Sequence, residues 1–182
     1  MKRIKKGEYG YRNSMKRGLL FKIAILAAFI LAQLGARWLT DSTALKNILT
    51  VPAANLASPY VAVLPFKTPA RDFYERMRPF EDKCQVLYDL VLTTKDDILP
   101  MDAILVHPAG IYAYCTNKKA DAARAEKALN EILKANRLDP NFRITKELSS
   151  FEKRAKSLKP ASEYEDDGSV EYGVNVMKGL SM

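Results

Sequence analysis

The longest apolar stretch of the chain lies close to its N-terminus. Residues 18–39, GLLFKIAILAAFILAQLGARWL, contain only two charged positions, Lys22 and Arg37. About 20 such residues in a helix cross the hydrocarbon core of a bilayer. Lys22 lies one turn inside the stretch, where its stem can reach the headgroups, and Trp38 lies where interfacial aromatic residues are common. The pattern predicts one transmembrane helix from Gly18 to Leu39.

Two alternatives to a single span remain open. The first is a cleaved signal peptide with its apolar core at 23–32, although Leu34 is a poor residue before the small pair Gly35-Ala36. The second concerns residues 48–66, ILTVPAANLASPYVAVLPF, which are also apolar. Three prolines interrupt them, and each removes a backbone donor from a helix. We therefore interpret 40–68 as a connector and keep a second span as the alternative.

Beyond the connector, the pattern is that of a small folded domain at 69–159. Alternating apolar positions predict strands, and positions spaced three and four apart predict helices. The expected order is helix, three strands, helix, strand, helix, at 69–78, 84–93, 101–107, 111–116, 119–137, 142–145 and 149–158. The predicted class is α/β, with α+β as the alternative: a small mixed sheet with flanking helices behind one transmembrane helix. Residues 160–182 are acidic without a clear period, which predicts a flexible tail.

Charge is unevenly distributed along the chain. The net charge is +8, and residues 1–17 carry seven Lys or Arg against Glu8 alone. We read 1–17 as a basic cytoplasmic tail beside the membrane. The positive-inside rule then predicts a single-pass protein of the cell membrane, with the C-terminal domain outside the cytoplasm. Nucleic-acid binding is disfavoured, because the basic charge gathers on the tail rather than on a face of the domain.

Residues with reactive side chains are few. The two cysteines, Cys84 and Cys115, are predicted to lie buried on sheet strands, and the sequence leaves open whether they pair. The single histidine, His107, precedes Pro108 in a predicted turn and cannot complete a zinc site with two cysteines so spaced. The residues indicate no metal and no cofactor.

One stretch resembles a known family. Residues 86–119 read VLYDLVLTTKDDILPMDAILVHPAGIYAYCTNKK. Asp102 before AILVH, followed by the turn HPAGIY, is similar to the nuclease-related domain family, called NERD. The similarity is good over 86–117 and loose over 70–158. It implies the PD-(D/E)xK nuclease fold, in which two carboxylates hold Mg²⁺ and a lysine assists the attacking water.

The resemblance places three residues at the positions of that site. Asp102 matches the first carboxylate, Cys115 stands where the second is expected, and Asn117 stands where the lysine is expected. A neutral thiol is a poor ligand for a hard cation, and an amide carries no positive charge. The site is therefore degenerate, and no residue is assigned a catalytic role.

These observations predict a membrane-anchored, non-catalytic nuclease-like domain that acts as a binding or assembly module. The expected partners are the lipid bilayer and a protein of a membrane complex. Two alternatives stay open: an active metal-dependent nuclease with a non-standard site, and a structural membrane component unrelated to nucleases.

Overall fold

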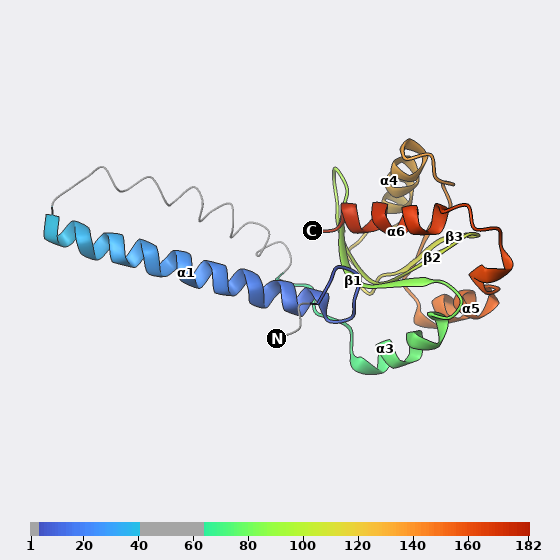
Figure 1. Ribbon diagram of the computed structural model, residues 1–182, viewed down its shortest axis with the longest axis horizontal. Helices are drawn as coiled ribbons and strands as arrows, with labels where there is room; N and C mark the ends of the chain where they lie inside the picture. The colour runs from blue at the N-terminus through green and yellow to red at the C-terminus, as the bar shows by residue number, and fades with distance from the viewer. Residues whose placement is uncertain (1–3, 41–63) are drawn as a thin grey trace. The chain divides into compact units, whose positions relative to one another are not determined.

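The computed structural model describes residues 4–40 and 64–182 (Figure 1). The chain divides into two compact units, which are described separately. The first contains Met1–Arg12 with Thr68–Met182, and the second contains Asn13–Lys67. Most of the predicted connector at 40–68 lies outside the described residues.

The first unit is built on a four-stranded mixed sheet, as the alternating pattern predicts. Its strands are β1 (Gln85–Thr93), β2 (Ile98–His107), β3 (Gly110–Tyr114) and β4 (Phe142–Thr145), in the order β1-β2-β3-β4. The first three are antiparallel, and β4 runs parallel to β3. A parallel neighbour requires a crossover, which α4 (Ala122–Ala135) provides. Asp121 begins α4 by accepting the backbone N–H of Arg124.

Helices cover both faces of the sheet. In Figure 1, α4 and α6 (Ser169–Leu180) lie on one face, while α3 (Arg71–Met77) and α5 (Leu148–Ser157) lie on the other. A short 3-10 helix, η2 (Arg78–Phe80), continues α3. Each face has its own apolar cluster, one around Leu129 and Met177 and the other around Phe73 and Phe151. The unit is thus a three-layer α/β arrangement.

The C-terminal segment is folded, so the predicted flexible tail at 160–182 is wrong. After η3 (Ala161–Glu163), the chain forms α6, whose Val174 and Met177 are buried against the sheet. Val170, Val174 and Met177 are spaced four and three residues apart, which gives the helix one apolar stripe. The acidic residues at 163–167 precede this stripe and dominate the composition of the segment.

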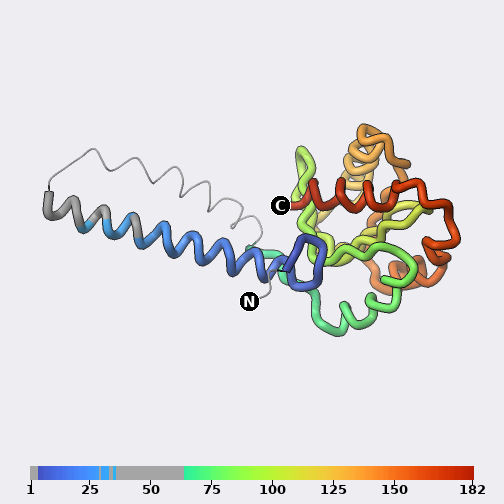
Figure 2. Tube along the Cα trace, in the orientation of Figure 1, coloured from blue at the N-terminus to red at the C-terminus, as the bar shows by residue number. Residues whose placement is uncertain are grey.

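The N-terminal segment is also folded, so a basic tail over 1–17 is wrong for its described residues up to Arg12. The carbonyl of Gly7 accepts the N–H of Tyr88 at 2.7 Å, which pairs the segment with the outer edge of β1. The hydroxyl of Tyr9 donates to the carbonyl of Pro69 at 2.9 Å. Figure 2 shows this segment, in dark blue, as a loop beside the green trace of β1.

Both edges of the sheet are occupied. At β1, Gly7 pairs with Tyr88, and further along the strand Ser181 pairs with Leu92. At β4, α4 supplies side chains instead: Asn130 exchanges two hydrogen bonds with the backbone of Phe142, and Glu126 accepts the N–H of Ile144. Occupied edges of this kind prevent strand addition by other chains.

The second unit contains most of α1 (Tyr11–Thr40), a helix of 30 residues. Among its described side chains, several large apolar ones are exposed, with Phe21 69% and Leu31 67% accessible. The ammonium of Lys16 donates to the carbonyls of Leu64, at 2.9 Å, and Phe66, so the chain returns to the beginning of this helix. Within the described residues, no helix has both the length and the apolar character that crossing a membrane requires.

Candidate functional site: an arginine buried between two aspartates

A buried ionic cluster joins the N-terminal segment to the sheet. Asp89 on β1 and Asp102 on β2 lie opposite each other, because the pairs on either side of them are in register. Between them lies the guanidinium of Arg12, from the first turn of α1, whose side chain is only 2% exposed. Arg12 Nη1 donates to Asp102 Oδ1 at 3.0 Å, and Arg12 Nε lies 3.4 Å from Asp89 Oδ1. We call these three residues the Arg12 cluster.

The Arg12 cluster has further hydrogen bonds in every direction. Arg12 Nη2 donates to the carbonyls of Met101 and Leu90. Asp102 Oδ2 accepts both the N–H of Thr116, at 2.9 Å, and its hydroxyl, at 2.7 Å. Both oxygens of Asp102 are therefore occupied by protein donors. A buried charge is tolerated when it is paired and hydrogen-bonded in this way.

Backbone geometry brings the N-terminal segment into place. Gly7 has φ +90°, and a Cβ there would lie 2.8 Å from Leu87 Cδ2, so a larger residue would clash as well as strain the backbone. Gly10, also at positive φ, donates its N–H to Asp89 Oδ2 at 3.0 Å. Asp89 itself has φ 61°, a left-handed conformation that is unusual within a strand. Asp tolerates this conformation better than most residues.

Burial also affects the protonation of Asp89. Desolvation raises the pKa of this carboxyl, while Arg12, Thr68 and the Gly10 amide oppose the shift by stabilising the charged form. The carboxylate depends on these partners, because a charge removed from water without them is costly. We conclude that the positive charge of Arg12 compensates the negative charges of two buried carboxylates, and that this charge compensation holds the Arg12 cluster together.

The structure brings two of the three degenerate positions together. Cys115 follows β3, whose Tyr114 pairs with Ala103, and so it lies beside Asp102. Its thiol is fully buried, and burial raises its pKa. Asn117 is different: β3 ends at Tyr114, and the Asn117 side chain accepts the N–H of Lys119 in the following turn. Residues 115 and 117 therefore both lie beyond the end of β3, and the strand predicted at 111–116 is shorter than expected.

Neither cysteine belongs to a strand, although both are buried as predicted. Cys84 precedes β1, and its sulfur donates to the carbonyl of Phe80. Burial raises the pKa of Cys84 to about 12. Cys84 and Cys115 are both free thiols. In residues 4–40 and 64–182, no group of three or more His, Cys, Asp or Glu is arranged to hold a metal ion.

Sequence reasoning missed Arg12 and Asp89 as members of a site. One signal was available, because the run VLYDLVL places a carboxylate inside an otherwise apolar strand. A carboxylate in such a position needs a partner. Arg12 and Asp89 are 77 positions apart, and the segment around Arg12 contains many other basic side chains. The spacing therefore does not identify Arg12 as the partner of Asp89.

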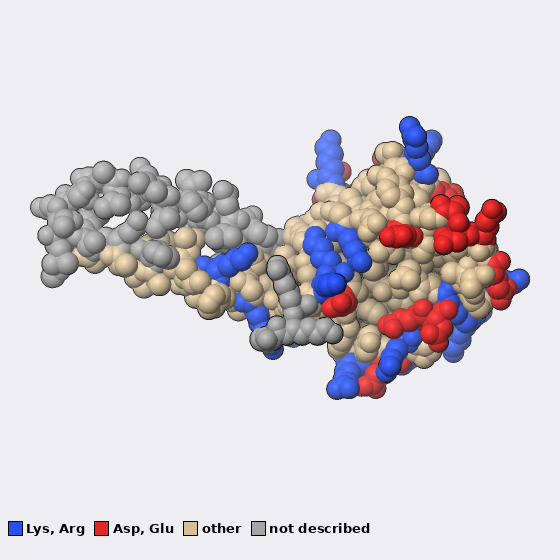
Figure 3. Space-filling model, in the orientation of Figure 1, with Lys and Arg blue, Asp and Glu red and all other residues tan. Residues whose placement is uncertain are grey.

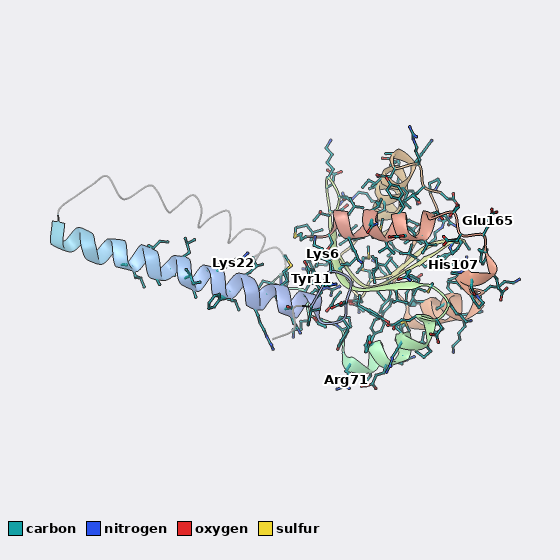
Figure 4. The ribbon with its side chains drawn as sticks, viewed as in Figure 1. Lys6, Tyr11, Lys22, Arg71, His107 and Glu165 are labelled. Atoms are coloured by element: carbon teal, nitrogen blue, oxygen red, sulfur yellow. The ribbon has the colours of Figure 1, made fainter. Side chains whose placement is uncertain are left out.

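Away from the Arg12 cluster, carboxylates gather near the C-terminal segment. A cleft of about 360 Å³ is lined by five of them with Lys83 as its one basic residue; the five are Glu81, Asp82, Glu165, Asp166 and Asp167. Figure 3 shows red side chains gathered at the end of the domain where Figure 4 labels Glu165 and His107. Such a surface repels phosphate groups.

His107 fastens the beginning of this C-terminal segment. Its Nδ1 accepts the N–H of Ala109 at 3.0 Å, and its Nε2 lies 2.9 Å from the carbonyl of Lys159. Nε2 therefore carries the proton, and the ring is neutral. The ring also packs edge-on against Tyr164. Burial lowers the pKa of His107, and the nearby Arg154 acts in the same direction.

Neither a family model, nor a curated protein, nor a solved structure matches this chain. The fold and the Arg12 cluster define a three-layer α/β domain. The resemblance to the nuclease-related family, good over 86–117 and loose over 70–158, rests on the sequence alone.

Proposed function

We propose that this protein is a membrane-anchored, non-catalytic α/β domain that acts as a binding or assembly module. The observation that carries the proposal is the guanidinium of Arg12 between Asp89 and Asp102. In the nuclease family that residues 86–117 resemble, the carboxylate that matches Asp102 is needed by the metal. Here its two oxygens accept from Arg12 and Thr116, so the position serves the architecture of the domain.

The anchor is proposed from the surface of α1. A helix that is apolar all round belongs in a protein core or in a membrane. Phe21 and Leu31 are largely exposed, and the printed sequence continues the apolar run through Phe29 and Leu34, whose side chains lie outside the described set. From residue 18 to residue 36, Lys22 is the only charge. The lipid bilayer is therefore the partner that fits this helix best.

A protein partner fits the domain better than a nucleic acid does. The carboxylate-lined cleft repels phosphate groups. Among the described residues that line this cleft, Tyr164 is the only aromatic one, and it packs on His107 instead of being free to stack on a base. The alternative of an active nuclease would need a different constellation of side chains. The alternative of a purely structural membrane component shares the anchor and differs only in having no partner for the domain.

The absence of nuclease activity can be tested with the purified full chain in detergent. We expect no Mg²⁺- or Mn²⁺-dependent cleavage of single- or double-stranded DNA or RNA. Cleavage that is lost in Asp102→Asn, which keeps the shape of the side chain, and retained in Asp82→Asn, an exposed carboxylate, would overturn the proposal and favour the active nuclease.

The anchor can be tested by cell fractionation. The full-length chain should remain in the membrane pellet after alkaline extraction and leave it only with detergent. Ile25→Asp combined with Leu31→Asp should move it to the soluble fraction, while Asn13→Asp, in the same helix before the apolar run, should not. A shortened, soluble wild-type product would contradict the anchor and support a cleaved signal peptide.

A further inference from the structure

The first unit is assembled from two separate stretches of the chain, one before α1 leaves it and one after residue 67. Arg12, the last residue of the first stretch, is buried against β1 and β2. At the beginning of the second stretch, Pro69 accepts a hydrogen bond from Tyr9. The chain therefore leaves the domain and re-enters it at neighbouring places.

The contacts that hold the N-terminal stretch are extensive. Besides the Arg12 cluster and the Gly7 pairing, Lys6 Nζ donates to the carbonyl of Ser181 at 2.6 Å, and the Tyr11 hydroxyl donates to that of Met182 at 3.3 Å. Figure 4 labels Lys6 and Tyr11 close to the end of α6. A stretch bound in this way cannot lie on the opposite side of a bilayer from the domain it completes.

From this, and resting on the proposed membrane anchor, we infer that the N-terminal segment and the domain lie on the same side of the membrane. If α1 crosses the bilayer, the chain must cross back before residue 68. Residues 13–67 are long enough for two crossings of about 20 residues each. The single-pass topology, with the N-terminus and the domain on opposite sides, is incompatible with the buried position of Arg12.

The described residues on either side of 41–63 are sufficient to infer that the chain returns to the side of the membrane from which it left. In the second unit, Lys16 near the beginning of α1 holds the carbonyls of Leu64 and Phe66, so the chain is already back beside its point of departure at those residues. The apolar run at 48–66 is the part of the sequence suited to a return through lipid, and its prolines are tolerated where neighbouring helices satisfy the freed carbonyls. The path itself falls at 41–63, outside the described residues.

The distribution of Lys and Arg then predicts on which side of the membrane the domain lies. Lys and Arg are dense on both flanks of this insertion, with seven among residues 1–17 and Lys67 and Arg71 soon after it. On the far side, the only Lys or Arg are Arg37, at the end of the first apolar run, and Lys46. The positive-inside rule therefore places both flanks in the cytoplasm. The domain is cytoplasmic, the reverse of the expectation based on a single span.

Labelling of single reporter cysteines with a membrane-impermeant maleimide tests the inference in intact cells that express the full-length chain. The reporters are Lys5→Cys in the N-terminal segment, Glu165→Cys in the domain and Ser42→Cys after α1; Lys5 and Glu165 are exposed. Wild type is the control, because Cys84 and Cys115 are buried. We expect Ser42→Cys to be labelled in intact cells, and Lys5→Cys and Glu165→Cys only after permeabilisation.

Each other outcome has a distinct meaning. Labelling of Lys5→Cys and Glu165→Cys from opposite sides, with the protein in the membrane pellet, would overturn the inference and leave the anchor intact. Labelling of all three only after permeabilisation would show that α1 does not cross, which also overturns it. Labelling of Lys5→Cys and Glu165→Cys in intact cells would overturn the cytoplasmic assignment. Recovery of the chain in the soluble fraction would remove the anchor, and the inference with it.

Discussion

The N-terminal segment, residues 4–12, and the C-terminal segment, residues 159–182, are attached to the same strand by different means. Both reach the outer edge of β1, where Gly7 pairs with Tyr88 and Ser181 pairs with Leu92. The N-terminal segment buries one charged side chain, Arg12, between two carboxylates. The C-terminal segment is held by the apolar stripe of α6, whose Met177 is fully buried.

The difference determines how each attachment fails. An apolar helix that loses one side chain loses contact area and leaves a cavity, and its other contacts remain. A buried ion cluster that loses its cation leaves carboxylates without compensation in a region that excludes water. We therefore expect the N-terminal attachment to be more sensitive to the loss of a single side chain than the C-terminal attachment.

Replacing Arg12 should have the largest effect. Arg12→Met should lower the free energy of unfolding by about 3–5 kcal/mol, because it leaves Asp89 and Asp102 buried without their cation. Urea unfolding of the full chain in detergent, followed by circular dichroism, measures the change. Arg124→Met is the matched control, because Arg124 pairs with Asp97 at the surface, and an exposed pair contributes little.

A second variant separates loss of charge balance from loss of packing. Adding Asp89→Asn and Asp102→Asn to Arg12→Met should restore part of the lost stability, because the uncompensated carboxylates are removed. If the triple variant is less stable than Arg12→Met alone, charge compensation is not what holds the N-terminal segment.

Truncating the apolar stripe of α6 should have an intermediate effect. Met177→Ala should cost about 2–3 kcal/mol, since it removes a fully buried side chain while Val174 and its neighbours stay in place. Asn175→Ala, at an exposed position of the same helix, is the control. A loss as large as that of Arg12→Met, measured in the same urea titration, would erase the distinction between the two attachments.

The contact between the two segments should contribute less. Lys6→Met removes the ammonium that donates to the carbonyls of Ser181 and Lys178, at the end of α6. Hydrogen bonds of this kind contribute about 1 kcal/mol each. Hydrogen exchange of the last turn of α6 should become faster, while exchange in β2 should not change. Lys5→Met, at an exposed neighbouring position, should leave both rates unaltered.

The smallest expected effect is a pH dependence of stability that arises from His107, which belongs to the C-terminal attachment. Burial lowers the pKa of His107 in the folded protein, so the unfolded chain binds a proton more readily between the folded and unfolded pKa values. Stability from this group is complete above the unfolded value, about 6.5, and declines as the pH falls below it. Protonation also removes the Nδ1 acceptor of the Ala109 amide.

His107→Gln should reduce this pH dependence, because the amide can still donate to the carbonyl of Lys159 but does not titrate. Urea midpoints of wild type and variant between pH 7.5 and pH 5 provide the measurement. An unchanged slope in the variant would mean that other groups, such as Asp89, govern stability in this range.

The regular elements of the sheet could be predicted from local patterns. Alternation located β1, β2 and β3, and the prediction of 142–145 for the fourth strand agrees with β4. The alternation of apolar and polar residues within a short window of sequence shows which side chains of a strand face the core, so each strand could be located from its own residues. The predicted strands at 101–107 and 111–116 also brought Cys115 beside Asp102, although β3 ends at Tyr114, so the proximity of these two residues followed from the sequence and the strand position of Cys115 did not.

The attachment of the two end segments could not be predicted in the same way. The apolar stripe of α6 was present at Val170, Val174 and Met177, but the acidic residues before it outweighed it in composition. The pairing of Arg12 with Asp89 and Asp102 depends on a contact that is distant in the chain. The sequence of a basic segment does not show whether one of its basic residues faces solvent, lipid or a buried carboxylate. Only the folded structure therefore distinguishes Arg12 from Arg17.

The separation of 90 residues between Arg12 and Asp102 has a consequence for biosynthesis. At about 5–20 residues per second, translation delivers β2 on the order of 5–20 s after Arg12 has left the ribosome. During that interval the residues of α1 are complete, while the domain has no sheet to receive Arg12. If α1 enters the membrane as proposed, it does so before the domain folds, and the N-terminal residues of the nascent chain are among the last to reach their final positions.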